Sequence, residues 1–141
     1  MSLDVRRPFK ASYPFQHWLD AIGVVVERLY PGRPAGAAWH ELGQVLVAGF
    51  EKTLSGRAAL TLASILGPRR ALQQLVRTFA KGCNYIESRI DEVAPNHFVV
   101  WVNEVGPHPE FTQGSLLAGL RLVGAPDPEV AIVQHDGHSG T

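Results

Sequence analysis

The fold is decided where the chain changes its hydrophobic period, in the stretch YIESRIDEVAPNHFVVWVNEV, residues 85–105. Residues 85–93 alternate between apolar and polar side chains, a pattern typical of a β-strand. Residues 94–96, Ala-Pro-Asn, are typical of a turn. Residues 98–105 are rich in valine and aromatic side chains on both faces, which predicts a strand covered on both sides. Together these segments predict an antiparallel hairpin.

Upstream of this hairpin, the apolar residues recur at the three- and four-residue steps of helices. The predicted helices cover residues 15–29, 37–54, 58–66 and 68–81. The helix at 58–66 is apolar nearly all round, which predicts burial on most sides. Gly43 and Gly49 lower the helix propensity of their segment, and they leave room for a neighbouring helix to approach closely.

Downstream of the hairpin, a helix is predicted at 111–123 and a third strand at 129–135. The dipeptide Asp136-Gly137 is typical of a tight hairpin turn. The predicted order is therefore α-α-α-α-β-β-α-β. Helices grouped before strands favour an α+β fold, with the N-terminal helices packed on a small antiparallel sheet.

The length of 141 residues predicts a single domain over residues 1–141. Only residues 138–141 follow the turn at Asp136-Gly137. We therefore expect the domain to lack a C-terminal strand. The predicted strand at 129–135 would then have an exposed edge, which a second copy of the chain could fill.

Charge and composition argue against several classes of protein. Lysine plus arginine total 13, as do aspartate plus glutamate, so the formal net charge is zero, and 45% of residues are hydrophobic. A domain that binds nucleic acid mainly by electrostatics carries a basic excess, and a disordered chain carries less apolar material. The apolar runs are too short to span a membrane. One cysteine, Cys83, allows no internal disulfide and favours a reduced, cytoplasmic compartment.

The common signatures of nucleotide, zinc and serine-hydrolase sites do not occur in the sequence, so no cofactor and no catalytic residue are predicted. Aromatic side chains are the main candidates for lining a ligand pocket between helices and sheet. The alternative is that they form ordinary core. These candidates are Trp18, Trp39, Phe50, Phe79, Phe98 and Trp101.

Acidic and histidine side chains near the two downstream turns are weak candidates for a metal site or for acid–base catalysis. They are Glu104, His108, His135 and His138. They would meet only if the third strand lay beside the second at the same end. Their spacing is not diagnostic of a metal site, so polar loop chemistry is the alternative. No nucleophile or oxyanion partner stands out beside them.

Two further features of the sequence invite a functional interpretation. Arg70, Arg77 and Lys81 share one face of the helix predicted at 68–81, and they form either a patch for phosphate or carboxylate groups or an ordinary solvated face. Cys83 is either a reactive thiol, for which Lys81 would have to lower the pKa, or a small buried hydrophobe.

Nearly the whole chain resembles an uncharacterised family found mainly in myxobacteria and known only as a domain of unknown function. The most specific parts of the resemblance are GPRRAL, residues 67–72, and WVNEVG, residues 101–106. Residues 29–32, 84–85 and 135–137 add to it. The family implies no settled activity, and its members continue beyond the point that corresponds to the end of this chain.

A more distant resemblance is to 4-vinyl-reductase-type domains, and through them to subunits of vesicle-tethering complexes and to haem-based nitric-oxide sensors. Those domains place helices against an antiparallel sheet and often hold an apolar ligand. The Tyr-x-Ser-x-Arg motif of the haem sensors is absent, because Ser88 and Arg89 follow Tyr85 at the wrong spacing. Haem is therefore not implied. Cys83 is the only candidate for the acylated cysteine of the tethering subunits.

Three functional hypotheses follow. The first is a non-catalytic, cytoplasmic regulatory module that binds a small apolar ligand or a protein partner. The second is a metal-dependent or acid–base enzyme that uses the Glu104, His108, His135 and His138 region. The third is a homo-oligomeric scaffold that pairs through an open sheet edge.

Overall fold

The computed structural model describes residues 13–74, 85–137 and 140. The predicted roles of Arg77, Phe79, Lys81, Cys83 and His138 lie outside these residues. The chain falls into two compact units, Met1–Pro34 and Ala35–Thr141, and each is described by itself.

The described part of the first unit consists of helix α1, Phe15–Leu29, and the turn that follows it. The backbone N–H of Tyr30 donates to the carbonyl of Val26 and closes the helix. Gly32 then adopts a φ of 77°, a conformation that L side chains rarely take. The apolar periodicity and the Pro-Gly stop together predicted these bounds correctly.

The centre of the second unit is the pair of helices α2, Ala35–Glu51, and α5, Glu110–Leu122. A Cβ built at Gly43 would overlap the carbonyl oxygen of Phe111, and one built at Gly114 would overlap the carbonyl of His40. The two helix backbones therefore touch. The Ser115 hydroxyl donates to the Phe111 carbonyl at 2.9 Å and to the Gly43 carbonyl at 3.3 Å, which joins the two helices at this crossing.

The core of the second unit lies around this crossing. Its buried apolar residues include Ala38, Trp39, Leu42, Phe111 and Leu116. The predicted close approach of a neighbouring helix is confirmed at Gly43. At Gly49 the prediction is wrong within the described residues, because no atom lies within 4 Å of a Cβ built there.

Helix α3, Leu54–Leu66, follows α2 after a short break. The Thr53 side chain caps it by accepting a hydrogen bond of 2.9 Å from the Gly56 N–H. The predicted burial of residues 58–66 on most sides is wrong: Leu62 is 58% exposed and Ile65 is 78% exposed. Gly56 is the only buried residue of α3, at the tight turn from α2, and the outer side of the helix is open to solvent.

Residues 68–74 are helical, as the Gly-Pro pair predicted. This helix contributes Ala71 and Leu72 to the core. It is tied to the hairpin by an ion pair between Arg69 and Glu92.

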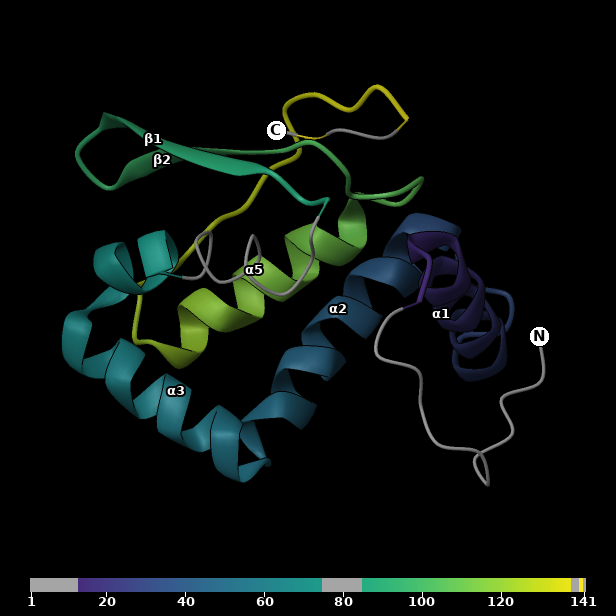
Figure 1. Cartoon of the computed structure of the whole chain (residues 1–141), viewed down its shortest axis with the longest axis horizontal. Helices are drawn as coiled ribbons and strands as arrows, with labels where there is room; N and C mark the ends of the chain where they lie inside the picture. The colour runs from purple at the N-terminus through teal and green to yellow at the C-terminus, as the bar shows by residue number, and fades with distance from the viewer. Residues whose placement is uncertain (1–12, 75–84, 138–139, 141) are drawn as a thin grey trace. The chain divides into compact units, whose positions relative to one another are not determined.

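The hairpin consists of β1, Ser88–Ala94, and β2, His97–Val102, paired antiparallel as predicted. The register places Ser88 opposite Val102 and Ile90 opposite Val100. Both strands are shorter than the predicted segments, and Asn103 marks the end of the ladder. Its side chain accepts a hydrogen bond from the Glu87 N–H at 2.8 Å and donates one to the Tyr85 carbonyl at 2.9 Å. In Figure 1, α5 lies between the hairpin and α2.

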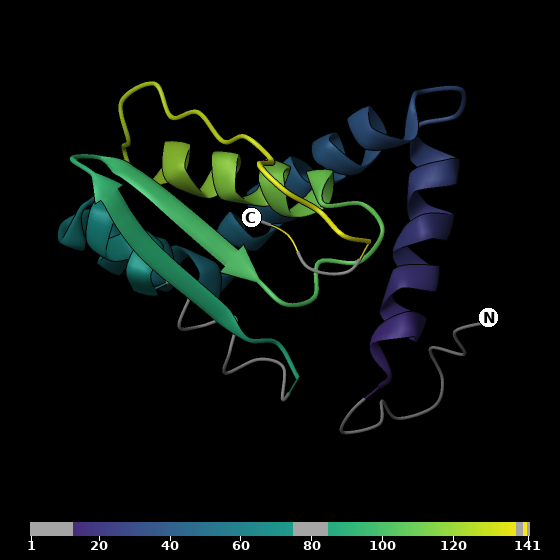
Figure 2. The same cartoon turned by 90° about the horizontal axis from the view of Figure 1, so that it is seen from above.

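The C-terminal segment, residues 125–137 with Gly140, replaces the predicted third strand. Residues 129–134 form no strand, because the carbonyl of Val130 accepts a hydrogen bond from the Gln113 side chain at 2.7 Å instead of joining a ladder. The tight turn predicted at Asp136-Gly137 stays a prediction, because the chain enters residues outside the described part directly after Gly137; an isolated bridge pairs His135 with Gly140. Gly140 also pairs with Val102, so the segment returns to β2, as Figure 2 shows in yellow.

The fold class is therefore α+β, as predicted, and the element order differs from the prediction only in the last strand. Among the described residues, no helix has the length and apolar character needed to cross a membrane.

Candidate functional site

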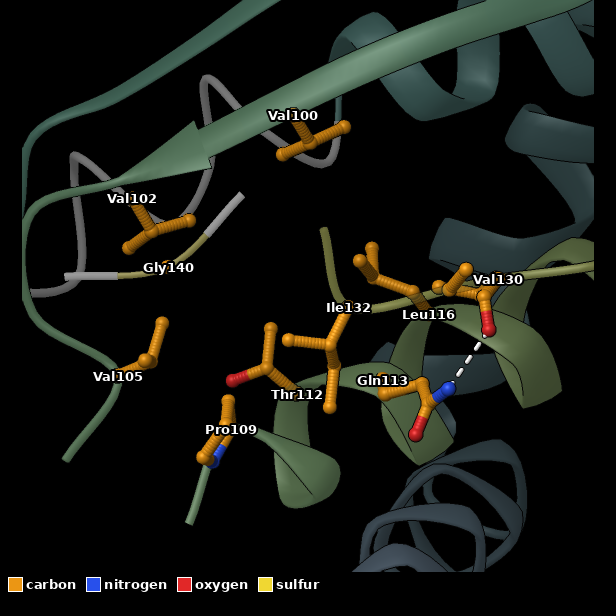
Figure 3. Close-up of a pocket in the computed structure, with 11 residues that line it drawn as sticks. Val100, Val102, Val105, Pro109, Thr112, Gln113, Leu116, Val130, Ile132 and Gly140 are labelled. Atoms are coloured by element: carbon orange, nitrogen blue, oxygen red, sulfur yellow. Dashed lines mark hydrogen bonds between the residues drawn. The ribbon is translucent and has the colours of Figure 1, made fainter. Parts of the chain in front are cut away.

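A small apolar cavity, called here the β2–α5 pocket, lies between β2, α5 and the C-terminal segment (Figure 3). Its volume is about 50 Å³. It is lined by Val100, Val102, Val105, Pro109, Thr112, Gln113, Leu116, Val130, Ala131, Ile132 and Gly140.

Secondary structure positions these side chains. Val100 and Val102 are two residues apart on β2, so they point to the same face of the strand. Thr112 and Leu116 are four residues apart on α5 and lie one above the other on the helix surface. Ile132 closes the pocket from the C-terminal segment.

The side chains that line the pocket carry almost no reactive groups. They include no histidine, cysteine or charged residue. The Gln113 amide is engaged by the Val130 carbonyl, the contact drawn as a dashed line in Figure 3. Pockets for drug-sized ligands enclose roughly 300–1,000 Å³. The β2–α5 pocket can therefore hold one small aliphatic group.

Of the predicted aromatic candidates, Trp39 is the most deeply buried one described. Its ring stacks on that of His108, with centroids 4.6 Å apart, and meets the edge of Phe111 at 6.2 Å. Trp39 thus packs at the α2–α5 contact, as ordinary core would.

The other described aromatic candidates belong to different elements. The Trp101 ring lies under the guanidinium of Arg89, 5.1 Å from the ring centroid to Cζ. Phe98 lies on β2, Phe50 is exposed on α2, and Trp18 belongs to α1. None of these side chains lines the β2–α5 pocket. A ligand-binding role for the predicted aromatic set stays a prediction.

The predicted metal and acid–base candidates converge only in part. Glu104 accepts a hydrogen bond from the Gly106 N–H at 2.9 Å, and the His135 Nε2 lies 2.9 Å from the Gly106 carbonyl oxygen. Both side chains thus hold the backbone of a glycine whose φ is 72°. His108 lies in the stack with Trp39. Within residues 13–74, 85–137 and 140, no three histidine, cysteine or acidic side chains are grouped as metal ligands.

Glu110, in the first turn of α5, was not singled out from the sequence. Its Oε2 is buried, makes no hydrogen bond to a described residue, and lies 3.9 Å from the Nδ1 of His108. A Cβ built at Gly36 would lie 2.9 Å from its Oε1, so Glu110 fills space that a side chain at that position would need. The position of Glu110 at a helix N-terminus is the one sequence feature that could have pointed to this residue.

The second unit also has an exposed basic residue and an exposed apolar surface. Arg70, the described member of the predicted basic face, is exposed. Large apolar side chains are exposed along the second half of α2 and along α3, a surface called here the α2–α3 face. Its members are Val45, Leu46, Phe50, Leu54, Leu62 and Ile65.

The fold and the pocket define a small α+β module with an apolar site at the flank of a hairpin. The family model described as "Protein of unknown function (DUF2378)" matches residues 1–141, and the chain belongs to this family. No curated protein and no solved structure matches the chain.

Proposed function

We propose that the protein is a non-catalytic binding module whose β2–α5 pocket takes one small aliphatic side chain of a protein partner. The observation that carries this proposal is the lining of the pocket, which is apolar and free of histidine, cysteine and charge. A regulatory role in the cytoplasm is part of the proposal. It is supported by the single cysteine and by the missing catalytic motifs.

Energetics favour a side chain of a larger partner over a free ligand. Burying one aliphatic side chain contributes about 1.5–3 kcal/mol. That free energy alone corresponds to a dissociation constant of roughly 10–100 mM. Such a contact becomes useful as one anchor within a larger interface, where other contacts add to it.

The proposal is tested by titrating the isotope-labelled protein with isobutanol and following its methyl and amide NMR signals. We expect the signals of Val100, Val102 and Leu116 to move first, because these residues line the pocket. The variant Leu116→Phe should abolish the response by filling the cavity. The matched control Leu46→Phe adds the same volume on the exposed side of α2 and should leave the response unchanged. A response spread evenly over the surface, or one that survives in Leu116→Phe, overturns the proposal.

A further inference from the structure

Helix α3, at the periphery of the second unit in Figure 1, carries an apolar stripe on its exposed side. The members of this stripe, called here the α3 stripe, are Leu54, Ala58, Leu62 and Ile65. Steps of four and three residues place them along one side of the helix. Leu54 is 79% exposed and Ile65 is 78% exposed. Gly56 lies on the other side, where a built Cβ would overlap the Phe50 carbonyl of α2.

The same part of the chain is basic. Residues 52–74 contain four basic residues and neither aspartate nor glutamate, although the whole chain has a formal net charge of zero. Arg69 forms the ion pair with Glu92. Lys52 and Arg57 are exposed and make no ion pair with a described residue. Glu51 precedes this stretch at the end of α2. The surface around α3 therefore complements an anionic partner.

The α3 stripe has the chemistry of a helix that lies on a lipid surface. Such a helix places aliphatic side chains among the acyl chains and cationic side chains at the lipid phosphates. Arg57 is three residues after Leu54, which makes it a neighbour of the stripe on the helix surface. Its long side chain can reach a phosphate while the stripe is inserted. The stripe contains no aromatic residue, whereas the anchors of protein interfaces are rich in tryptophan and tyrosine.

We propose that α3 docks the protein onto the surface of an anionic lipid bilayer. The helix lies in the plane of the bilayer, the α3 stripe enters the boundary between headgroups and acyl chains, and Arg57 binds lipid phosphate. The attachment is peripheral. It involves none of the residues that line the β2–α5 pocket, so it goes beyond the proposed function.

The test measures co-sedimentation of the full chain with two kinds of sucrose-loaded vesicles. One kind consists of phosphatidylcholine alone, and the other is an equimolar mixture of phosphatidylcholine and phosphatidylserine. We expect binding to the mixed vesicles, with at least about tenfold weaker binding to phosphatidylcholine alone, because each basic residue near an anionic surface strengthens binding about fivefold. Absence of binding to the mixed vesicles, or equal binding to both kinds, overturns the proposal.

Matched serine variants test the apolar stripe. Ile65→Ser should weaken binding to the mixed vesicles at least about tenfold, since one large aliphatic side chain is no longer buried in lipid. Val133→Ser removes an equally exposed aliphatic side chain from the C-terminal segment and should bind as the unaltered protein does. Circular dichroism checks the fold, and Leu54→Ser replaces Ile65→Ser if that variant fails to fold. Unchanged binding in the folded α3 variant, or an equal loss in Val133→Ser, contradicts the proposal.

A second matched pair tests the charge beside the stripe. Arg57→Gln should weaken binding to the mixed vesicles about fivefold. Arg28→Gln removes an exposed arginine of α1 and should leave binding unchanged. An equal loss in the two variants would mean that the attraction depends on overall charge and not on α3, which overturns the proposal.

Measurements without vesicles separate the remaining occupants of the α3 stripe. A dimer in light scattering that Ile65→Ser dissociates would mean that a second copy covers α3. A large loss of stability in a monomeric Ile65→Ser would mean that the chain itself covers α3. Either result overturns the proposal. The isobutanol titration of the β2–α5 pocket uses no vesicles, so the proposed function stands or fails separately.

Discussion

Gly43 of α2 and Gly114 of α5 make a reciprocal contact, in which each glycine lies against the backbone of the other helix. The space that a Cβ would need at Gly43 is taken by the Phe111 carbonyl, and at Gly114 by the His40 carbonyl. This contact sets the distance between the two helices and, through α5, the place of the β2–α5 pocket.

Adding one methyl group at this crossing should destabilise the protein. We expect Gly43→Ala and Gly114→Ala each to lower the free energy of unfolding by about 1–3 kcal/mol, because backbone atoms cannot yield as a flexible side chain would. Urea denaturation measures the change.

The chain offers a matched control on each helix. Gly49 of α2 and Gly119 of α5 have no described atom within 4 Å of a built Cβ. Alanine there should raise the free energy of unfolding by up to about 1 kcal/mol, the difference in helix propensity. A stabilising effect of Gly43→Ala would contradict the reciprocal contact.

The α2–α3 face should tolerate polar substitution. Ile65 is exposed, so Ile65→Ser should change the free energy of unfolding by less than about 0.5 kcal/mol. In contrast, Leu42→Ala on the buried side of α2 should cost about 2–5 kcal/mol. Thermal unfolding compares the stability of the two variants, and a large loss of stability in Ile65→Ser would show that another part of the protein covers α3.

The cap of α3 gives a local prediction. Thr53→Ala removes the acceptor for the Gly56 N–H and should lower the free energy of unfolding by about 1 kcal/mol. Thr53→Asp keeps a capping oxygen and should be close to neutral. If urea denaturation shows the same loss of stability in both variants, the capping hydrogen bond does not stabilise the N-terminus of α3.

The Asn103 side chain should stabilise the open end of the hairpin, where β1 begins and β2 ends. In Asn103→Ala, the Glu87 N–H loses its acceptor on the Asn103 side chain, so its hydrogen exchange should accelerate, while that of Val99 inside the ladder should change little. An unchanged exchange rate at Glu87 would mean that the bond from the Asn103 N–H to the Glu87 carbonyl suffices to hold the two strands together at this end.

Local sequence patterns predicted the helices and the hairpin well, because the formation of these elements depends on residues that are close in sequence. The apolar period of residues 15–29 and the turn at 94–96 led to the correct helix and hairpin. Burial of α3 was predicted wrongly, since an apolar side chain at Ile65 does not reveal whether another element covers it. The strand predicted at 129–135 failed for a related reason: Val130 and Ile132 line a cavity beside a helix and have no strand partner among the described residues.

The pocket could not be predicted from the sequence. Val100, Leu116 and Ile132 belong to three segments, and each taken alone resembles ordinary core. Only the register at β2 and the path of the C-terminal segment bring them together. The predicted histidine and acidic residues did approach one another near Gly106, but through backbone contacts that no spacing rule describes.

The pair between Val102 and Gly140 closes residues 103–139, including all of α5, into a ring. The hairpin joins residues close in sequence and can form within microseconds, whereas this ring joins distant residues and must wait for α5 to settle on α2. Ring closure is therefore expected late in folding. Because two backbone hydrogen bonds hold it at this point, it should also be among the first contacts to open when the native protein fluctuates.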